Sequence, residues 1–393
     1  MSRSLISRSD DLSKLQDEGY EVDIQSGYLV IRNVPYVNSQ RQVKRGLLVS
    51  TLDLNDDVTT RPSTHQAFFA GEYPCDSNGR PLETIVNGQA SVNLGNGVTA
   101  NHSFSSRPAE GYQDYYHKMS TYINILSAYA REIDTQATAK TFAVIENKSA
   151  DSVFEYMDSA SSRAGISSAS AKLDSEKIAI VGLGGTGSYV LDLIAKTPVK
   201  EIHLFDDDDF LQHNAFRSPG AASKEELRAR YKKVEYLSER YGVMRRGIEE
   251  HAVHIDADNV SLLKGMTFVF ICIDNGAAKL PIIEYLEKEG ISFIDVGIGI
   301  YFKEQDAKIG GHIRVTTSTD KMRKCARQHI DFSEGGPDNV YEQNVQVADL
   351  NALNANLAVI KWKKLLGFYF DFDNEHNSTY TIDGNSLTNE RHA

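Results

Sequence analysis

A glycine-rich turn and a carboxylate that follows it are the first residues in this sequence that could do chemistry together. The glycines of the turn are Gly182, Gly184, Gly185 and Gly187. They follow the apolar run 177–181 and precede a helical stretch, so the start of the helix can present free backbone N–H groups to phosphate oxygens. Asp206 ends the next apolar run, where a carboxylate can accept hydrogen bonds from ribose hydroxyls. This arrangement predicts a nucleotide site without choosing between NAD and ATP.

A second group of polar residues favours ATP over NAD. The group consists of Asp208, Asn214, Arg217, Lys233 and Asp274. Attack of a carboxylate on the α-phosphate of ATP brings two anions together, so the reaction needs fixed cations and a carboxylate for Mg²⁺. Arg217 and Lys233 can supply the cations, and Asp274 the carboxylate. An NAD(P)-dependent oxidoreductase needs no such trio.

These short motifs and their order along the chain resemble those of the ThiF/MoeB/E1 superfamily of adenylating enzymes. That superfamily has a GxGGxG turn, a D-x-D cluster, an S-N-x-x-R segment, a lysine and a C-x-D-N segment. The chain supplies these blocks in the same order, with His213 where the family often has serine and Cys272 at the start of the last block. The resemblance covers roughly residues 177–369, and the family resemblance that these residues carry implies ATP and Mg²⁺ at this site.

The resemblance also implies a role for each site residue. It implies that Asp274 contacts the phosphates of Mg-ATP, that Asp206 in the D-x-D cluster holds the ribose, and that Asn214 orients the phosphates or the attacking carboxylate. The family usually has a further phosphate-contacting arginine on a helix before the first strand, sometimes donated by a dimer partner. Arg163 is the match for that arginine in this chain. A homodimer is expected on the same resemblance.

The residue that would carry the activated product remains open among three alternatives. Many E1 enzymes use a cysteine in a crossover loop, here residues 316–344, and Cys325 lies there in the basic segment KMRKCARQH, which favours a thiolate. Alignment of the last helix places the family's thioester position nearer Ser333, whose hydroxyl needs a base such as His329. The third alternative is direct transfer of the acyl-adenylate to a partner, with no covalent intermediate on this chain.

The elements around these residues indicate two domains. Residues 177–393 alternate apolar strands with helices, as in a Rossmann-like α/β adenylation domain with a mainly parallel sheet. Its predicted elements are strands 177–181, 201–205, 267–273 and 291–296, and helices 189–195 and 347–366. Residues 1–157 indicate a smaller α+β domain. Its predicted elements are strands 28–34 and 45–52, an antiparallel sheet with tight turns over 77–97, and a helix over 112–133. The Ser- and Ala-rich residues 158–176 are predicted to form a linker or a short helix.

Composition excludes several other classes of protein. The net charge of −12 argues against a nucleic-acid binder that works through a broad basic face. The three cysteines lie far apart without a CxxC pair, which excludes a disulfide framework and a four-cysteine zinc site, so no zinc site is expected. Without a long apolar stretch or a signal-peptide core, we expect a cytoplasmic protein with no membrane partner.

The leading hypothesis is an E1-like enzyme that adenylates the C-terminal glycine of a ubiquitin-like protein and passes it to an E2-like carrier. The whole chain is similar to bacterial two-domain ThiF-like proteins encoded in ubiquitin-like conjugation operons, which implies that the N-terminal domain recruits one of these partners. Two alternatives within the family are a sulfur-carrier-protein adenylyltransferase of the ThiF/MoeB type and a tRNA-modifying dehydratase. An NAD(P)-dependent oxidoreductase and an inactive scaffold are the alternatives outside it.

Overall fold

A computed structural model describes residues 2–95, 97–146, 152–333 and 345–391 of the chain. The chain forms two compact units, which we describe separately. The first unit contains residues 1–145 and 158–165, and the second contains residues 146–157 and 166–393. The segment predicted as a linker is therefore divided between the units and includes the short helices α4 (Ser159–Arg163) and α5 (Ser167–Ser170). Among the described helices, none is both long enough and apolar enough to cross a membrane.

The first unit is an antiparallel sheet with helices, as the sequence predicts for its N-terminal domain. Its strands, in the order β1-β2-β3-β6-β8-β7, are β1 (Glu21–Gln25), β2 (Tyr28–Val37), β3 (Val43–Thr51), β6 (Gln66–Ala70), β8 (Val98–Ser105) and β7 (Val86–Gly95). A small separate ladder joins β4 (Leu54–Asn55) and β5 (Val58–Thr59), and the helices are α1 (Ser2–Arg8), α2 (Asp10–Asp17) and α3 (Tyr115–Ile133). The predicted strands at 28 and 45 are β2 and β3, and the turn-rich stretch leads into the β7–β8 hairpin.

Helix α3 supplies the aromatic core of the first unit. The side chain of Asp114 caps its first turn by accepting the N–H of His117 at 2.6 Å. Tyr115, Met119 and Tyr122 recur at helical spacing and are fully buried in the same apolar cluster as Phe104 of β8. The aromatic stretch therefore serves as helix core, because its rings face the sheet.

Helix α3 also buries a charged residue, and this gives a testable pH dependence. Lys118 is completely buried, and its Nζ donates to Ser50 Oγ at 2.9 Å and to the Thr64 carbonyl at 2.8 Å. Burial lowers the pKa of Lys118 from 10.5 to about 8. Between these two pH values the unfolded chain binds more protons than the native one, so Lys118 makes stability rise with pH in this window, by up to about 3 kcal/mol.

We expect Lys118→Met to abolish this rise between pH 8 and pH 10.5, whereas the exposed Lys44→Met should retain it. The measurement is urea unfolding of the full chain, followed by far-UV circular dichroism and by Trp362 fluorescence. The unfolding transition that appears in circular dichroism but not in fluorescence is assigned to the first unit. Trp362 is the only tryptophan and is buried in the second unit. A pH dependence that is the same in both variants would contradict the assignment.

The second unit contains an eight-stranded sheet in the order β11-β10-β9-β12-β13-β14-β15-β16. The strands are β11 (Ile248–His251), β10 (Glu201–Phe205), β9 (Lys177–Val181), β12 (Phe268–Ile271), β13 (Ser292–Lys303), β14 (Lys308–Ser318), β15 (Glu375–Thr381) and β16 (Ser386–Arg391). The ladders from β11 to β13 are parallel, and those from β13 to β16 are antiparallel. The predicted strands 177–181 and 201–205 coincide with β9 and β10, and the mainly parallel α/β sheet is confirmed.

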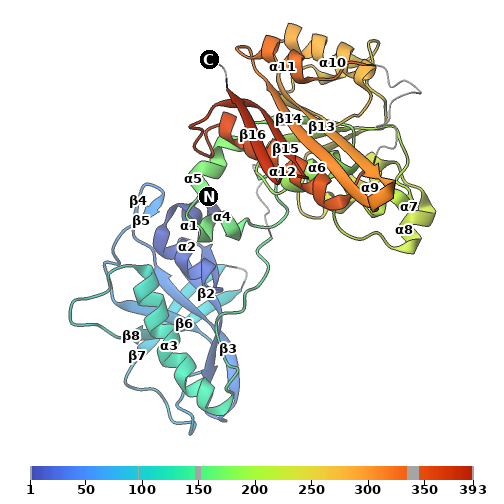
Figure 1. The fold of residues 1–393 in the computed structure, drawn as a ribbon. Coiled ribbons are helices and arrows are strands. Elements are labelled where there is room, and N and C mark those ends of the chain that lie inside the picture. The colour runs from blue at the N-terminus through green and yellow to red at the C-terminus, as the bar shows by residue number, and fades with distance from the viewer. Residues whose placement is uncertain (1, 96, 147–151, 334–344, 392–393) are drawn as a thin grey trace. The chain divides into compact units, whose positions relative to one another are not determined.

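Helices cover both faces of this sheet (Figure 1). The longer ones are α6 (Gly185–Ala195), α9 (Lys233–Gly242), α10 (Gly276–Lys288) and α12 (Ala348–Leu365), and the shorter ones are α7 (Gln212–Ala215), α8 (Lys224–Ala229) and α11 (Arg323–His329). Ile178 and Ile180 of β9 join the apolar cluster of α6, α9 and α12, whereas Ala179 and Val181 join that of α10. The strand reads as a continuous apolar run because both of its faces are buried.

Candidate active site

Three neighbouring parallel strands end at the same level of the sheet. Val181 of β9 is in register with Phe205 of β10 on one side and with Ile271 of β12 on the other. The chain connections from these strands diverge at β9, and such a point leaves a crevice at the carboxyl ends of the strands. A cavity of about 450 Å³ lies there.

Most of the residues that the sequence predicts for the nucleotide site line this cavity. Those that do are Gly182, Gly184, Gly185, Asp206, Asp208, Arg217, Lys233 and Asp274, together with Cys272. Those that are not among its lining residues are Gly187, Asn214, Arg163, Cys325 and Ser333. The structure therefore gathers the phosphate, ribose and metal candidates in one place and leaves both candidate nucleophiles outside the lining.

The glycines of the turn have different structural roles. Gly182 has a φ of +91°, which favours glycine, and a side chain there would meet the carbonyl of Cys272 at 2.8 Å. A Cβ on Gly187 would lie 1.9 Å from the Gly182 carbonyl oxygen, so this position needs glycine for close packing of helix on strand. Gly184 has open space in front of it. A ligand phosphate can approach the backbone at Gly184, at the start of helix α6.

Asp206 braces the glycine turn. Its Oδ2 accepts the backbone N–H of Leu183 at 2.7 Å, and its Oδ1 accepts that of Asp208 at 3.0 Å. Lys233 Nζ lies 3.2 Å from Asp206 Oδ1 and 2.5 Å from Asp208 Oδ2. The hydrogen bond from Lys233 lowers the pKa of Asp208, whose side chain is 70% exposed. The positive charge of Lys233 is therefore shared by two carboxylates, and Asp208 is the one that faces the open cavity.

Arg217 lines the cavity at the end of the segment that follows α7. Its Nε is buried and has no hydrogen-bond partner among the described residues. Asn351 of α12 holds the backbone here, since its Nδ2 lies 3.5 Å from the Arg217 carbonyl oxygen and its Oδ1 accepts from Thr186 of α6 at 3.2 Å. Because a buried guanidinium N–H that lacks a partner costs free energy, an anionic ligand in the cavity would stabilise Arg217.

Sequence reasoning missed a buried ionic triad in the cavity wall. Asp295 of β13 is fully buried, and its carboxylate lies 2.7 Å from Lys279 Nζ and 2.7 Å from Arg314 Nη2. Lys279 and Arg314 both line the cavity. Because two cations share one carboxylate, the triad carries a net positive charge, which favours anionic ligands. The sequence contains one sign of this triad, because Asp295 is a carboxylate within the apolar strand run ISFIDV. A carboxylate buried in such a strand requires buried partners.

Two predicted site residues have structural contacts instead of a place in the lining. Asn214 is buried, and its Oδ1 accepts the backbone N–H of Leu211 at 2.8 Å, so its amide holds the turn that leads to Arg217. Arg163 belongs to the first unit and donates to the Asp17 carbonyl from Nε, at 3.1 Å, and from Nη2. Within the second unit, Asn214 is not among the lining residues, and a role for Arg163 stays a prediction.

Cys325 lies on helix α11 and is half-buried. The sequence predicts that flanking cations favour its thiolate, but two of these cations are engaged elsewhere. Arg323 pairs with Asp320 at 2.5 Å, and Arg327 pairs with Glu287 at 2.7 Å through two of its nitrogens. A covalent role for Cys325 stays a prediction.

Ser333 lies closer to the cavity through its contact with a lining residue. Its Oγ donates to Asp331 Oδ1 at 2.7 Å, and Asp331 lines the cavity. The hydrogen bonds from Ser333 lower the pKa of Asp331, which makes that carboxylate a weak base. His329, the base that the sequence predicts, instead lies 3.1 Å from Glu390. The remaining crossover residues 334–344 lie outside the described residues.

Comparison with known proteins adds two family matches. A model described as "ThiF family" matches residues 166–392, and one described as "Domain of unknown function (DUF6791)" matches residues 10–159. Over 134 residues the chain is 31% identical to a tRNA threonylcarbamoyladenosine dehydratase of Haemophilus influenzae, covering 32% of this chain and 49% of that protein. Over 151 residues it is 26% identical to a ubiquitin-like modifier-activating enzyme 5 of Branchiostoma floridae, covering 35% of each. The chain thus spans about half or less of these relatives.

Solved structures with a similar fold include those of PaaA and of E. coli MccB. The PaaA structure has a TM-score of 0.44 at 16% identity, covering 57% of this chain and 66% of that one. The structure of E. coli MccB with ATP has a TM-score of 0.41 at 17% identity, covering 57% of this chain and 65% of that one.

Proposed function

The chain belongs to the ThiF family, and from this membership we propose that it is an ATP-dependent adenylyltransferase that activates a carboxylate. The observation that carries the proposal is the cavity of about 450 Å³ at the strand ends. It combines an accessible glycine turn, the carboxylates of Asp208 and Asp274, and the cation of Arg217. The predicted resemblance to the ThiF superfamily is confirmed, whereas the activity and its substrate belong to this proposal.

The proposed substrate is the C-terminal glycine of a ubiquitin-like protein. The relative named ubiquitin-like modifier-activating enzyme 5 supports a ubiquitin-like partner. We further propose that the activated product is passed to an E2-like carrier and that the protein acts as a homodimer in the cytoplasm. Residues 1–157 would recruit one of the partners, and residues 177–393 would perform adenylation.

In the proposed reaction, an oxygen of the substrate carboxylate attacks the α-phosphorus of ATP. The bond from that phosphorus to the bridging oxygen of the β-phosphate breaks, and pyrophosphate leaves with the electron pair, so an acyl-adenylate forms without a proton transfer. Arg217 would bind the phosphates as a two-pronged donor, and the start of α6 would donate backbone N–H groups to them. The Lys279–Asp295–Arg314 triad would add a net positive charge to the wall.

The residues of the cavity also fit a divalent cation. Asp274 and Asp208 are exposed carboxylates at the cavity, and carboxylate oxygens are the ligands that Mg²⁺ prefers. Bound Mg²⁺ would neutralise phosphate charge during the reaction. Asp206 is less available to the ion, because it accepts two backbone N–H groups and contacts Lys233.

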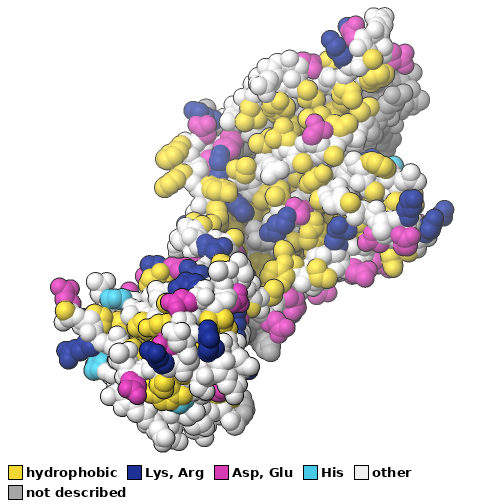
Figure 2. Space-filling model, turned by 90° about the horizontal axis from the view of Figure 1, so that it is seen from below, with side chains coloured by type: hydrophobic (Ala, Val, Ile, Leu, Met, Phe, Trp, Pro, Cys, Tyr) yellow, Lys and Arg dark blue, Asp and Glu magenta, His cyan; other side chains and the backbone are white. Residues whose placement is uncertain are grey.

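A tRNA-modifying dehydratase is the second candidate function, and the higher identity of 31% to the Haemophilus influenzae relative favours it. The net charge of −12 disfavours it, because tRNA binding generally needs a basic face. In the view of Figure 2, the Lys and Arg side chains are scattered among acidic ones and do not form one broad basic patch. We therefore favour a protein carboxylate as the substrate.

The experiment that tests the proposal is ATP–pyrophosphate exchange with the full chain. We expect exchange to require a ubiquitin-like protein with a C-terminal glycine and to be lost when that glycine is removed. A DTT-sensitive adduct would indicate Cys325, a hydroxide-sensitive but DTT-resistant adduct would indicate Ser333, and the absence of an adduct would indicate direct transfer. Exchange that requires tRNA would establish the second candidate. NAD binding without any exchange would overturn the adenylyltransferase proposal.

A further inference from the structure

A cluster of metal-ligating side chains lies away from the nucleotide cavity in the second unit. His329 ends helix α11, His376 belongs to strand β15, and Glu390 belongs to strand β16. The ligand atoms of these three side chains all lie within 4.8 Å of one another. His376 is buried, His329 is partly exposed and Glu390 is half exposed, so the cluster is held by the fold and open to solvent on one side.

The geometry is close to that of a tetrahedral zinc site. With bonds of roughly 2.0–2.2 Å to nitrogen and oxygen ligands, the ligand atoms of such a site lie about 3.3 Å apart. His329 Nε2 and Glu390 Oε2 are 3.1 Å apart. His376 has a ring nitrogen within 4.8 Å of the ligand atoms of both other residues.

A β-bulge aims the buried histidine at the other two ligands. Glu375 pairs with Arg391 and Asn377 pairs with Glu390, so His376 is the extra residue between two consecutive pairs. An extra residue of this kind rotates its side chain out of the normal alternation of a strand, and bulges are frequent next to functional sites. The bulge therefore gives His376 a direction that a regular strand would not give it.

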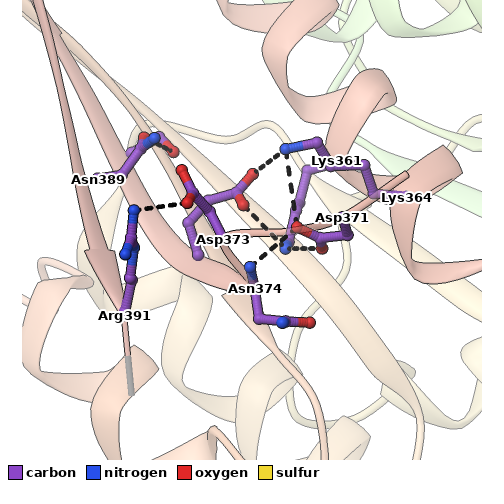
Figure 3. Close-up of polar contacts among 9 residues, drawn as sticks. Lys361, Lys364, Asp371, Asp373, Asn374, Asn389 and Arg391 are labelled. Carbon is purple, nitrogen blue, oxygen red and sulfur yellow. Dashed lines mark hydrogen bonds and ion pairs between the residues drawn. The ribbon is translucent and has the colours of Figure 1, made fainter. Parts of the chain in front are cut away.

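Ion pairs fix the two residues, Glu375 and Arg391, that pair on one side of the bulge. Figure 3 shows Arg391, next to Glu390, pointing to Asp373, and its Nη2 lies 2.5 Å from Asp373 Oδ1. Glu375, next to His376, lies 2.8 Å from Lys364 Nζ and 3.5 Å from Lys361 Nζ. The strand pair on one side of the bulge is thus held in place, as a preorganised metal site requires.

A chain of hydrogen bonds leads from this cluster to the nucleotide cavity. Glu390 Oε1 accepts from Asn377 Nδ2 at 2.9 Å, Asn377 Oδ1 accepts from Thr316 Oγ1 at 2.8 Å, and Thr316 Oγ1 accepts from Arg314 Nη1 at 2.5 Å. Arg314 then pairs with Asp295 in the cavity wall. Hydrogen bonds to a metal-ligating carboxylate orient it for the metal. Here the same series of hydrogen bonds reaches Arg314, which lines the cavity.

We propose that His329, His376 and Glu390 bind one Zn²⁺ ion, with water in the fourth position. Two imidazoles and one carboxylate form a donor set typical of zinc. The ion would join the end of helix α11 to the β15–β16 hairpin, and through Asn377 it would stabilise the position of Arg314. The absence of CxxC pairs predicts no zinc site of the cysteine type, whereas this site uses histidines that only the fold brings together. The proposal does not depend on the adenylation reaction.

The test uses untagged full-length protein, stripped of metal by chelator and titrated with Zn²⁺ against a chromophoric competitor. We expect one ion per chain, an affinity lower by about 100-fold or more in His376→Ala and Glu390→Gln, and an affinity lower by about 10-fold in Asn377→Ala. His102→Ala, which changes a histidine of the first unit, should bind as the wild type does.

Metal content of the protein after purification, measured by mass spectrometry, gives a second readout. Trp362 fluorescence checks that each variant retains the fold of the second unit. The Glu390→Gln variant keeps an oxygen acceptor for Asn377, so loss of Zn²⁺ binding in a folded Glu390→Gln protein would support the site directly. Unchanged Zn²⁺ affinity in the folded variants, or no Zn²⁺ binding by the wild type, would overturn the proposal.

Discussion

Arg217→Ala is expected to lower the rate of ATP–pyrophosphate exchange by about 10²–10³-fold. The reason is that Arg217 brings a guanidinium with a buried Nε, unpartnered among the described residues, to the cavity, where it can neutralise charge that develops on the phosphates. Asp274→Ala should have an effect of similar size if it binds the phosphates through Mg²⁺. Both substitutions should leave the fold of the second unit intact.

The matched control for Arg217→Ala is Arg228→Ala. Arg228 lies on helix α8, is largely exposed and pairs only weakly with Glu225 at 3.6 Å. Its loss removes the same formal charge without touching the cavity, so exchange should change little. Equilibrium dialysis with ATP provides a measurement that needs no protein partner. Near-normal exchange and near-normal ATP binding in both Arg217→Ala and Asp274→Ala would show that the cavity is not the ATP site.

Asp295→Asn is expected to lower the free energy of unfolding of the second unit by about 3–5 kcal/mol. The substitution keeps the size of the side chain but leaves the cations of Lys279 and Arg314 without their shared carboxylate. Asp295 is fully buried and Lys279 nearly so, which limits how far water can replace the lost interaction. The unfolding of this unit can be followed through the fluorescence of Trp362, which is buried in its core.

Glu287→Gln is the matched control for the effect of burial. Glu287 also pairs with an arginine, Arg327, at 2.7 Å, but Arg327 is 38% exposed. A pair of this kind contributes about 1 kcal/mol or less, so the control should unfold at nearly the same urea concentration as the wild type. Equal losses in Asp295→Asn and Glu287→Gln would contradict the view that burial makes the triad important.

Part of the site could be predicted because its signals are local. The continuous apolar runs 177–181 and 201–205 predict strands buried on both faces, and both strands have the predicted bounds. Glycines that follow such a strand and precede a helix predict a tight turn, and Gly182 has the positive φ that this turn needs. Parallel strands align their carboxyl ends, so residues that follow them, such as Asp206 and Asp274, meet at one edge.

Other expectations depended on contacts that the sequence does not show. Asn214 was expected at the phosphates, but its amide is engaged by the backbone of Leu211. Cys325 was expected to have activating cations beside it, but Arg323 and Arg327 pair with carboxylates. In each case the residue type is compatible with the predicted role, and that role stays a prediction.

The sequence by itself determined the parallel α/β sheet, the glycine turn and the order of the nucleotide-site residues, because these follow from short-range patterns of apolar and polar residues. Only the tertiary structure decided which distant side chains meet. Packing of α10 and β14 against β13 created the triad around Asp295, and a one-residue bulge in β15 turned His376 toward His329 and Glu390. The physical reason is that buried charges and metal ligands act over a few ångströms, a distance set by how the elements pack and register.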